Sequence, residues 1–197
     1  MTGRIGAVVL AGGRSSRFGR DKLAEPIDGR PLLHHAVAAV QIVATDLIVV
    51  IAPGASIEPP PGARLVHDAR AFEGPLAGLA AGLAALHPAV DRAVVVAGDM
   101  PSLAPAVLAR LIEALGPSVE AVVLESDGRL NPLPMALRPA TALPAARRLL
   151  ASGERRLGAL PGAIPTHVIA EAAWRLDDPD AATLRDIDRQ ADLVDVD

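Results

Sequence analysis

The chain of 197 residues contains no cysteine, no tyrosine, two phenylalanines and one tryptophan. The absence of cysteine excludes disulfides, thiolate nucleophiles and thiolate metal sites, and it fits a reducing compartment. So few aromatic rings argue against binding of single-stranded nucleic acid, which uses rings as stacking platforms. The formal net charge of −4 provides no basic field for DNA or RNA. No apolar run reaches the length of a membrane span, and the first residues lack a signal-peptide pattern. We therefore expect a cytoplasmic protein with no nucleic-acid partner and no membrane partner.

What the chain has is aliphatic: 51% of its residues are hydrophobic, mostly Ala, Val and Leu. This length and composition predict one domain over residues 1–197 with a substantial core. Strands are expected at residues 5–10, 46–52, 64–67, 91–97, 119–125, 133–138 and 165–169. Helices are expected at residues 31–43, 74–86, 104–115, 141–151 and 155–160, with a polar helix or tail from residue 179. This alternation predicts an α/β fold, a single-domain open, mainly parallel sheet with helices on both faces. The returning pair near residues 119–138 would add an antiparallel strand at one side.

Local signals refine this pattern at two places. Asp28-Gly29 is a strong turn signal that should join two short extended pieces. In the helix expected at residues 74–86, Gly78 and Gly82 lower the intrinsic helix propensity. Their expected use is close packing of the helix backbone, either against the sheet or against a flat base.

The segment 5–22 carries the strongest chemical signal. A buried apolar strand leads directly into Gly12-Gly13, and four cations follow within nine residues. These cations are Arg14, Arg17, Arg20 and Lys22. Glycines let the backbone approach a ligand closely, successive N–H groups form an anion site, and cations contact phosphates. Neither a Walker A loop nor a dinucleotide fingerprint has this spacing. The segment therefore predicts a loop around nucleotide phosphates, and the alternative is an ordinary strand-to-helix turn with solvated arginines.

Two carboxylates are expected beside this loop. In an open α/β sheet, ligands bind outside the carboxyl ends of the strands, and Gly12, Asp68 and Asp99 all follow predicted strands. A single carboxylate such as Asp99 can hold Mg²⁺, which keeps several waters and bridges to phosphates. The alternative role for Asp99 is that of a helix N-cap.

The segment LAGGRSSRFGRDK at residues 10–22 resembles the signature of the sugar-1-phosphate-type nucleotidyltransferases, and most closely that of the molybdenum cofactor guanylyltransferases. The resemblance continues in register along nearly the whole chain. Its further segments are HDARAFEGPLAGLAAGL at 67–83, VVAGDMP at 95–101, DGRLNPLPMAL at 127–137 and SGERRLGAL at 152–160.

This resemblance implies a Rossmann-like nucleotidyltransferase fold and an activity: transfer of GMP from GTP to molybdopterin with release of pyrophosphate. It implies nucleotide contacts at Leu10, Ala11, Gly12, Gly13, Lys22, Asp68 and Asp99. Arg17 and Lys22 would hold phosphates, and Asp99 would bind Mg²⁺, so that these three form the catalytic group. The implied cofactor is Mg²⁺, and the implied partners are GTP, molybdopterin and, transiently, cofactor-delivery proteins.

Two segments depart from the guanylyltransferase pattern. Asn131 stands where the family has a histidine, and Asp186 and Asp188 stand where it has an asparagine pair. An aspartate adds negative charge and loses the two N–H donors of asparagine, which would weaken binding of an anionic acceptor. Two alternatives therefore stay open: a related enzyme with another base or acceptor, such as a molybdopterin cytidylyltransferase, and a nucleotide-binding module without catalysis.

Overall fold

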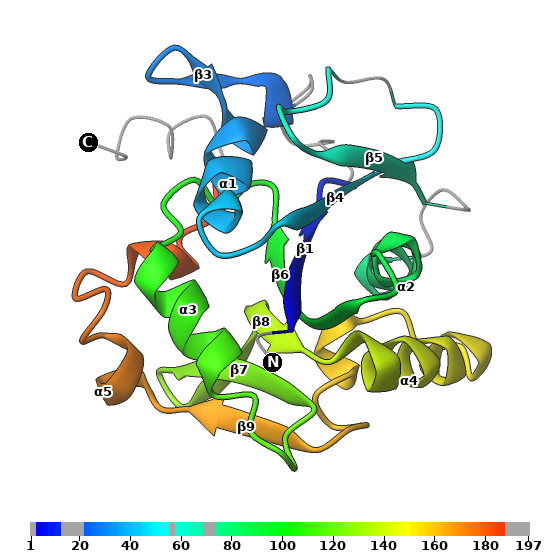
Figure 1. Ribbon diagram of the computed structural model, residues 1–197. Helices are drawn as coiled ribbons and strands as arrows, with labels where there is room; N and C mark the ends of the chain where they lie inside the picture. Colours follow the sequence, from blue (N-terminus) through cyan, green and yellow to red (C-terminus); the bar gives the residue numbers. More distant parts are fainter. Residues whose placement is uncertain (1–2, 13–21, 56–57, 69–73, 188–197) are drawn as a thin grey trace.

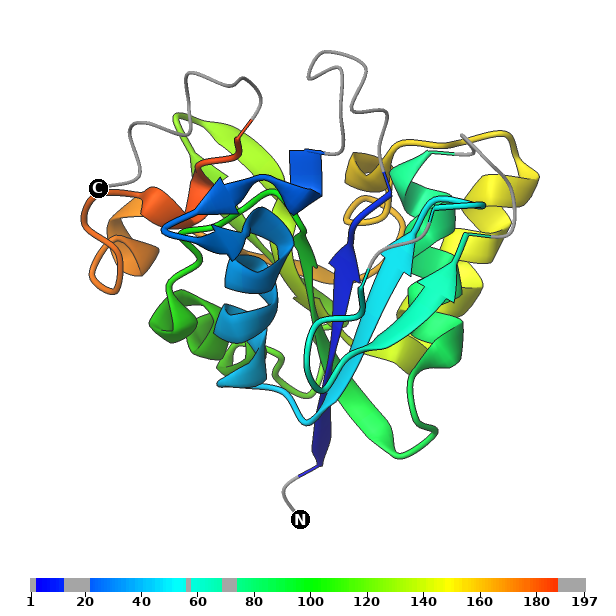
Figure 2. The same cartoon turned by 90° about the horizontal axis from the view of Figure 1, so that it is seen from above.

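The computed structural model describes residues 3–12, 22–55, 58–68 and 74–187. Its centre is a seven-stranded sheet in the order β5-β4-β1-β6-β8-β7-β9. The strands are β1 (Arg4–Leu10), β4 (Asp46–Ile51), β5 (Arg64–His67), β6 (Val90–Ala97), β7 (Ala121–Ser126), β8 (Arg129–Leu137) and β9 (Thr166–Ile169). Figures 1 and 2 show β1 in the middle of the molecule with helices to either side.

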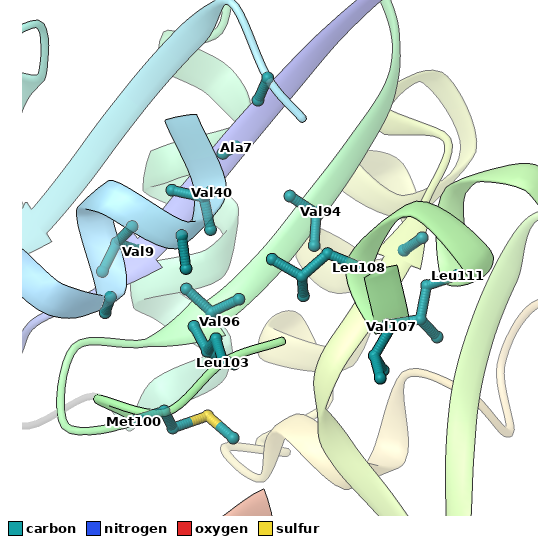
Figure 3. Packing of buried hydrophobic residues seen from close by; sticks show 14 of the residues in the cluster. Ala7, Val9, Val40, Val94, Val96, Met100, Leu103, Val107, Leu108 and Leu111 are labelled. Carbon is teal, nitrogen blue, oxygen red and sulfur yellow. The ribbon is translucent and has the colours of Figure 1, made fainter. Parts of the chain in front are cut away.

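Helices cover both faces of this sheet, as the alternation of strands and helices predicts. They are α1 (Leu32–Gln41), α2 (Pro75–Ala85), α3 (Pro105–Glu113), α4 (Pro139–Ala151) and the short α5 (Glu171–Trp174). Side chains alternate along a strand, so Ala7 and Val9 of β1 pack with α1 and α3 in one core cluster. Figure 3 shows this cluster, in which Val96 lies between the two helices. Val8 points the other way, into a second cluster with α2 and α4.

The antiparallel strand does not lie at one side of the sheet, which corrects the sequence-based expectation. β8 is internal: Val95 of β6 pairs with Met135 on one side, and Val123 of β7 pairs with the same residue on the other. β7 then pairs in parallel with β9, which forms the actual edge. The three residues 132–134 are a bulge, because Leu124 next pairs with Asn131. The two prolines of β8 fall in this bulge, where no ladder donor is needed.

The short hairpin expected around residue 28 is confirmed. β2 (Pro26–Ile27) pairs with β3 (Arg30–Pro31) in an antiparallel manner. Asp28 and Gly29 have φ values of 49° and 73°, the left-handed pair that a tight two-residue hairpin requires.

Several smaller boundaries differ from expectation. The helix expected at residues 155–160 is only a 3₁₀ turn (Leu157–Ala159), and the segment after residue 179 contains a 3₁₀ turn (Ala182–Leu184) rather than an α-helix within the described residues. The helix α5, which the sequence pattern did not predict, buries Trp174 completely. Along the described part of the chain, no helix is both long and apolar enough to cross a membrane.

Candidate active site

The end of β1 is held between two neighbouring strands. The amide of Ala11 donates to the carbonyl of Val50 at 2.8 Å, and the amide of Gly98 donates to the carbonyl of Leu10 at 2.9 Å. A Cβ at Gly98 would lie 3.0 Å from Leu33 Cδ1 and 3.5 Å from the side chain of Ala11. Glycine at 98 thus lets the strand ends of β1 and β6 meet α1 closely. Gly12 follows, exposed at the carboxyl edge of the sheet.

Lys22 and Asp99 meet at this edge, although they are 77 residues apart in the sequence. Lys22 opens the 3₁₀ helix η1 (Lys22–Ala24), and its Nζ lies 2.9 Å from Oδ2 of Asp99. The two side chains are 11% and 28% exposed, so a lysine and a carboxylate share a partly dehydrated position beside β1. The helix-cap alternative for Asp99 is wrong, because α3 begins at Pro105 and its N-cap is Ala104.

The donor set around Asp99 fits a magnesium ion that is held mainly by a phosphate ligand. Within the described residues, no three His, Cys, Asp or Glu side chains gather as a metal cage. The only hydrogen bond that the described residues make to the Asp99 carboxylate reaches Oδ2, which leaves Oδ1 for a cation. Mg²⁺ usually takes one or two carboxylates and completes its octahedron with water and phosphate oxygens.

Asp68 lies on the other flank of β1, after β5. Its amide donates to the carbonyl of Ile51 at 2.9 Å, which continues the strand pairing. A Cβ built on Gly78 of α2 would lie 3.6 Å from Leu10 Cδ2 and 4.0 Å from Oδ2 of Asp68. Asp68, Gly78 and Leu10 are therefore neighbours beside the end of β1.

The segment 152–160 packs against the start of α2. The carbonyl of Arg155 accepts a hydrogen bond from the amide of Leu76 at 3.4 Å, and a Cβ at Gly74 would lie only 2.8 Å from that carbonyl. The Glu154 carboxylate accepts hydrogen bonds from the side chain and amide of Arg156 and from the amide of Arg155, which lower the pKa of Glu154 to about 2. Two segments that were identified separately by resemblance are thus adjacent in space.

The structure therefore brings together Lys22 with Asp99, and Leu10 with Asp68, around the end of β1. Ala11 and Gly12 continue the same edge, whereas Gly13 and Arg17 lie outside the described residues. One neighbour of the site was not predicted: the amide of Ile187 donates to the carbonyl of Asp99 at 3.0 Å. The family resemblance singles out its neighbours Asp186 and Asp188, whereas Ile187 itself is only an isolated aliphatic residue within an acidic segment.

A mainly parallel α/β sheet with a glycine-bearing strand end and a lysine–aspartate pair at its carboxyl edge is typical of a nucleotide-binding enzyme. The sequence model of the family described as "MobA-like NTP transferase domain" matches residues 7–166. The chain belongs to this family, and it is a nucleotidyltransferase. These findings confirm both the fold class and the family resemblance that the sequence indicated.

Two curated relatives show how far the similarity extends. A probable molybdenum cofactor guanylyltransferase of Chloroflexus aggregans is 36% identical over 196 residues, with 96% of this chain and 91% of the relative covered. The molybdenum cofactor guanylyltransferase of Xanthomonas euvesicatoria is 37% identical over 169 residues, with 84% and 82% covered.

Solved structures share the fold at lower identity. A molybdopterin-guanine dinucleotide biosynthesis protein A from Archaeoglobus fulgidus has a TM-score of 0.75 at 20% identity, with 96% of this chain and 95% of that chain covered. A 2-C-methyl-D-erythritol 4-phosphate cytidylyltransferase from Thermus thermophilus has a TM-score of 0.72 at 21% identity, with 97% and 96% covered. The fold is thus shared by enzymes whose names give different bases and acceptors.

Proposed function

We propose that this protein transfers GMP from GTP to molybdopterin and releases pyrophosphate, forming the guanine dinucleotide cofactor. The name shared by the curated relatives supports guanine as the base and molybdopterin as the acceptor. The observation that carries the chemistry is the contact of Lys22 Nζ with Asp99 Oδ2 at the carboxyl edge of the sheet. It gives one site both a cation for phosphate and a carboxylate for a metal ion.

In the proposed reaction, an oxygen of the terminal phosphate of molybdopterin bonds to the α-phosphorus of GTP. The bond from that phosphorus to the bridging oxygen breaks, and pyrophosphate leaves with the electron pair. A phosphate oxygen is already a nucleophile, so no serine, cysteine or histidine needs activation. The protein's task is to align two anions and to stabilise the added charge of the transition state.

Each residue of the site has a role in this alignment. Lys22 would bind the phosphates of GTP together with Arg17, and the edge formed by Leu10, Ala11, Gly12 and Gly13 would line the nucleotide, with Asp68 as a further contact. Asp99 would hold Mg²⁺, which supplies charge neutralisation at the phosphates when bound. Because Lys22 already faces Asp99, the cation and the metal ligand would act on the same triphosphate.

The cellular setting follows from this role and is part of the proposal. We place the protein in the cytoplasm, with transient contacts to proteins that deliver the molybdenum cofactor.

Turnover is the test of this function. Pyrophosphate release should require GTP, Mg²⁺ and molybdopterin together, and Asp99→Ala should abolish it while the melting temperature stays close to that of the wild type. Thermal-shift titration with GTP, CTP, ATP and UTP, each with Mg²⁺, should show stabilisation by GTP, since a ligand stabilises the state that binds it. Stabilisation by CTP instead would identify a cytidylyltransferase. Nucleotide binding without any turnover would identify a module without catalysis.

A further inference from the structure

The loop that carries Asp99 is held at both ends by the C-terminal segment. This loop, residues 98–104, connects β6 to α3. At its far end the amide of Ala104 donates to Oγ1 of Thr183 at 3.0 Å. At its near end the carbonyl of Asp99 accepts from the amide of Ile187 at 3.0 Å. Two residues four positions apart in the C-terminal segment therefore fix the two ends of one loop.

Thr183 is itself placed by a buried carboxylate. Asp178, only 7% exposed, accepts hydrogen bonds from the amides of Ala182 at 3.1 Å and Thr183 at 2.7 Å. Thr183 is completely buried, and its Oγ1 accepts the hydrogen bond from the amide of Ala104 away from solvent. The segment thus presents fixed groups to the loop rather than merely covering it.

Ile187 also packs against the segment that carries Lys22, the other half of the ion pair. Its side chain is 3% exposed and packs in a small cluster with the buried Ile27 and Leu32 and the partly buried Leu23. Leu23 is the neighbour of Lys22 in η1. The three buried members of this cluster belong to neither of the two main core clusters, whereas Leu23 also packs against the cluster formed with α1 and α3. Leu23 thus connects Ile187 both to the segment of Lys22 and to the core.

We propose that residues 183–187 form a clamp that positions the ion pair, and that Ile187 is its principal positioning residue. Its backbone amide fixes the peptide of Asp99, and its side chain fixes the segment that begins at Lys22. Groups that orient a metal ligand contribute strongly to metal affinity, and the clamp would orient Asp99 through its backbone. The catalytic meaning of the clamp rests on the proposed function, whereas its geometry does not.

The test compares Ile187→Ala with the conservative Ile187→Val and with a matched control. Ile164 is a suitable control because it is 8% exposed and packs in the core cluster on the opposite face of the sheet from α1 and α3. Hydrogen exchange is measured at residues 98–104, and Mn²⁺ affinity is measured by electron paramagnetic resonance with GTP present. Ile187→Ala should accelerate exchange in the loop and weaken Mn²⁺ binding roughly 10-fold. Ile187→Val should keep loop exchange and Mn²⁺ affinity close to those of the wild type. Ile164→Ala should lower the melting temperature without changing loop exchange or Mn²⁺ affinity.

Thr183→Val is an independent test of the clamp. It removes the hydroxyl that accepts the hydrogen bond from the Ala104 amide and keeps the volume of the side chain. It should accelerate exchange of the Ala104 amide, and it serves where Ile187→Ala does not fold. Wild-type exchange in residues 98–104 for both variants would overturn the clamp. A different result would contradict the proposed function: the wild-type protein would release no pyrophosphate in the presence of GTP, Mg²⁺ and molybdopterin. In that case the exchange experiment would still decide whether the clamp exists.

Discussion

Gly82→Ala should destabilise the protein because it forces a methyl group into the contact between α2 and the sheet. A Cβ at this position would lie 2.4 Å from Val8 Cγ1 and 2.9 Å from Val50 Cγ2. Both valines are buried and β-branched, so they cannot turn away easily. Restoring an ordinary contact requires a shift of about 1 Å. Because neither valine can turn away, the cost should lie in the upper part of the range typical of overpacking, at about 2–3 kcal/mol. Alanine regains about 1 kcal/mol of helix propensity, so the net loss should be about 1–2 kcal/mol.

Gly78→Ala is the matched control, one helical turn earlier in α2. Its built Cβ has no neighbour closer than 3.6 Å, which is ordinary contact. We expect this variant to be neutral or more stable by up to about 1 kcal/mol. Because the new methyl would face Leu10 and Asp68, Gly78→Ala should change nucleotide affinity instead.

Thermal unfolding checks both expectations. For a chain of this size, each kcal/mol shifts the melting temperature by about 2–4 °C, so Gly82→Ala should melt about 2–8 °C lower than the wild type. Adding Val8→Ala should reveal a favourable coupling of at least about 0.5 kcal/mol, because it removes the two methyl groups of Val8, one of which makes the shortest of these contacts. A Gly82→Ala protein as stable as the wild type would refute the reasoning. So would equal effects at Gly78 and Gly82.

Three further outcomes are expected. Lys22→Ala should weaken GTP binding by about 1.5–3 kcal/mol, the magnitude of a charge-assisted contact, as measured by calorimetry. Unchanged affinity would contradict a role for Lys22 in binding the phosphates. The hydrogen bonds from Arg156 lower the pKa of the Glu154 carboxyl from 4.5 to about 2. The ionised carboxylate therefore stabilises the folded protein fully at pH values above 4.5, and this stabilisation is lost as the pH falls toward 2. Arg156→Ala should therefore raise the Glu154 titration midpoint seen by NMR, and an unmoved midpoint would contradict this cause. Asp186→Asn should lower the KM for molybdopterin while leaving the KM for GTP unchanged, and equal changes in both would reject a role in acceptor binding.

The parallel half of the fold could be predicted from local patterns. The strands β1, β4 and β6 each contain an apolar run, and they lie side by side with helices on both faces. The position of Asp99 beyond β6 could be predicted for the same reason, since parallel strands end at one edge. Lys22 could not be placed against Asp99 by spacing, because the residues between β1 and η1 do not follow a periodic pattern.

The place of β8 depends on pairing that no local pattern records. Its sequence contains Pro132 and Pro134, which suit an edge strand, yet the strand lies between β6 and β7. The bulge resolves this conflict by removing both prolines from the ladder. Ile187 was missed for a related reason: its partners, Asp99 and Ile27, are far away in the sequence, and a single apolar residue in an acidic segment has no periodicity.

The two departures from the guanylyltransferase pattern that lie in the described residues fall on one side of the site. Because β8 runs opposite to β6, Asn131 near its start lies at the same sheet edge as Asp99. Asp186 directly precedes Ile187, whose amide contacts Asp99. Gly78 and Asp68, which lie in segments that resemble the family, are on the other flank of β1, next to Leu10. Under the proposed function, both departures would therefore bear on the acceptor more than on the nucleotide.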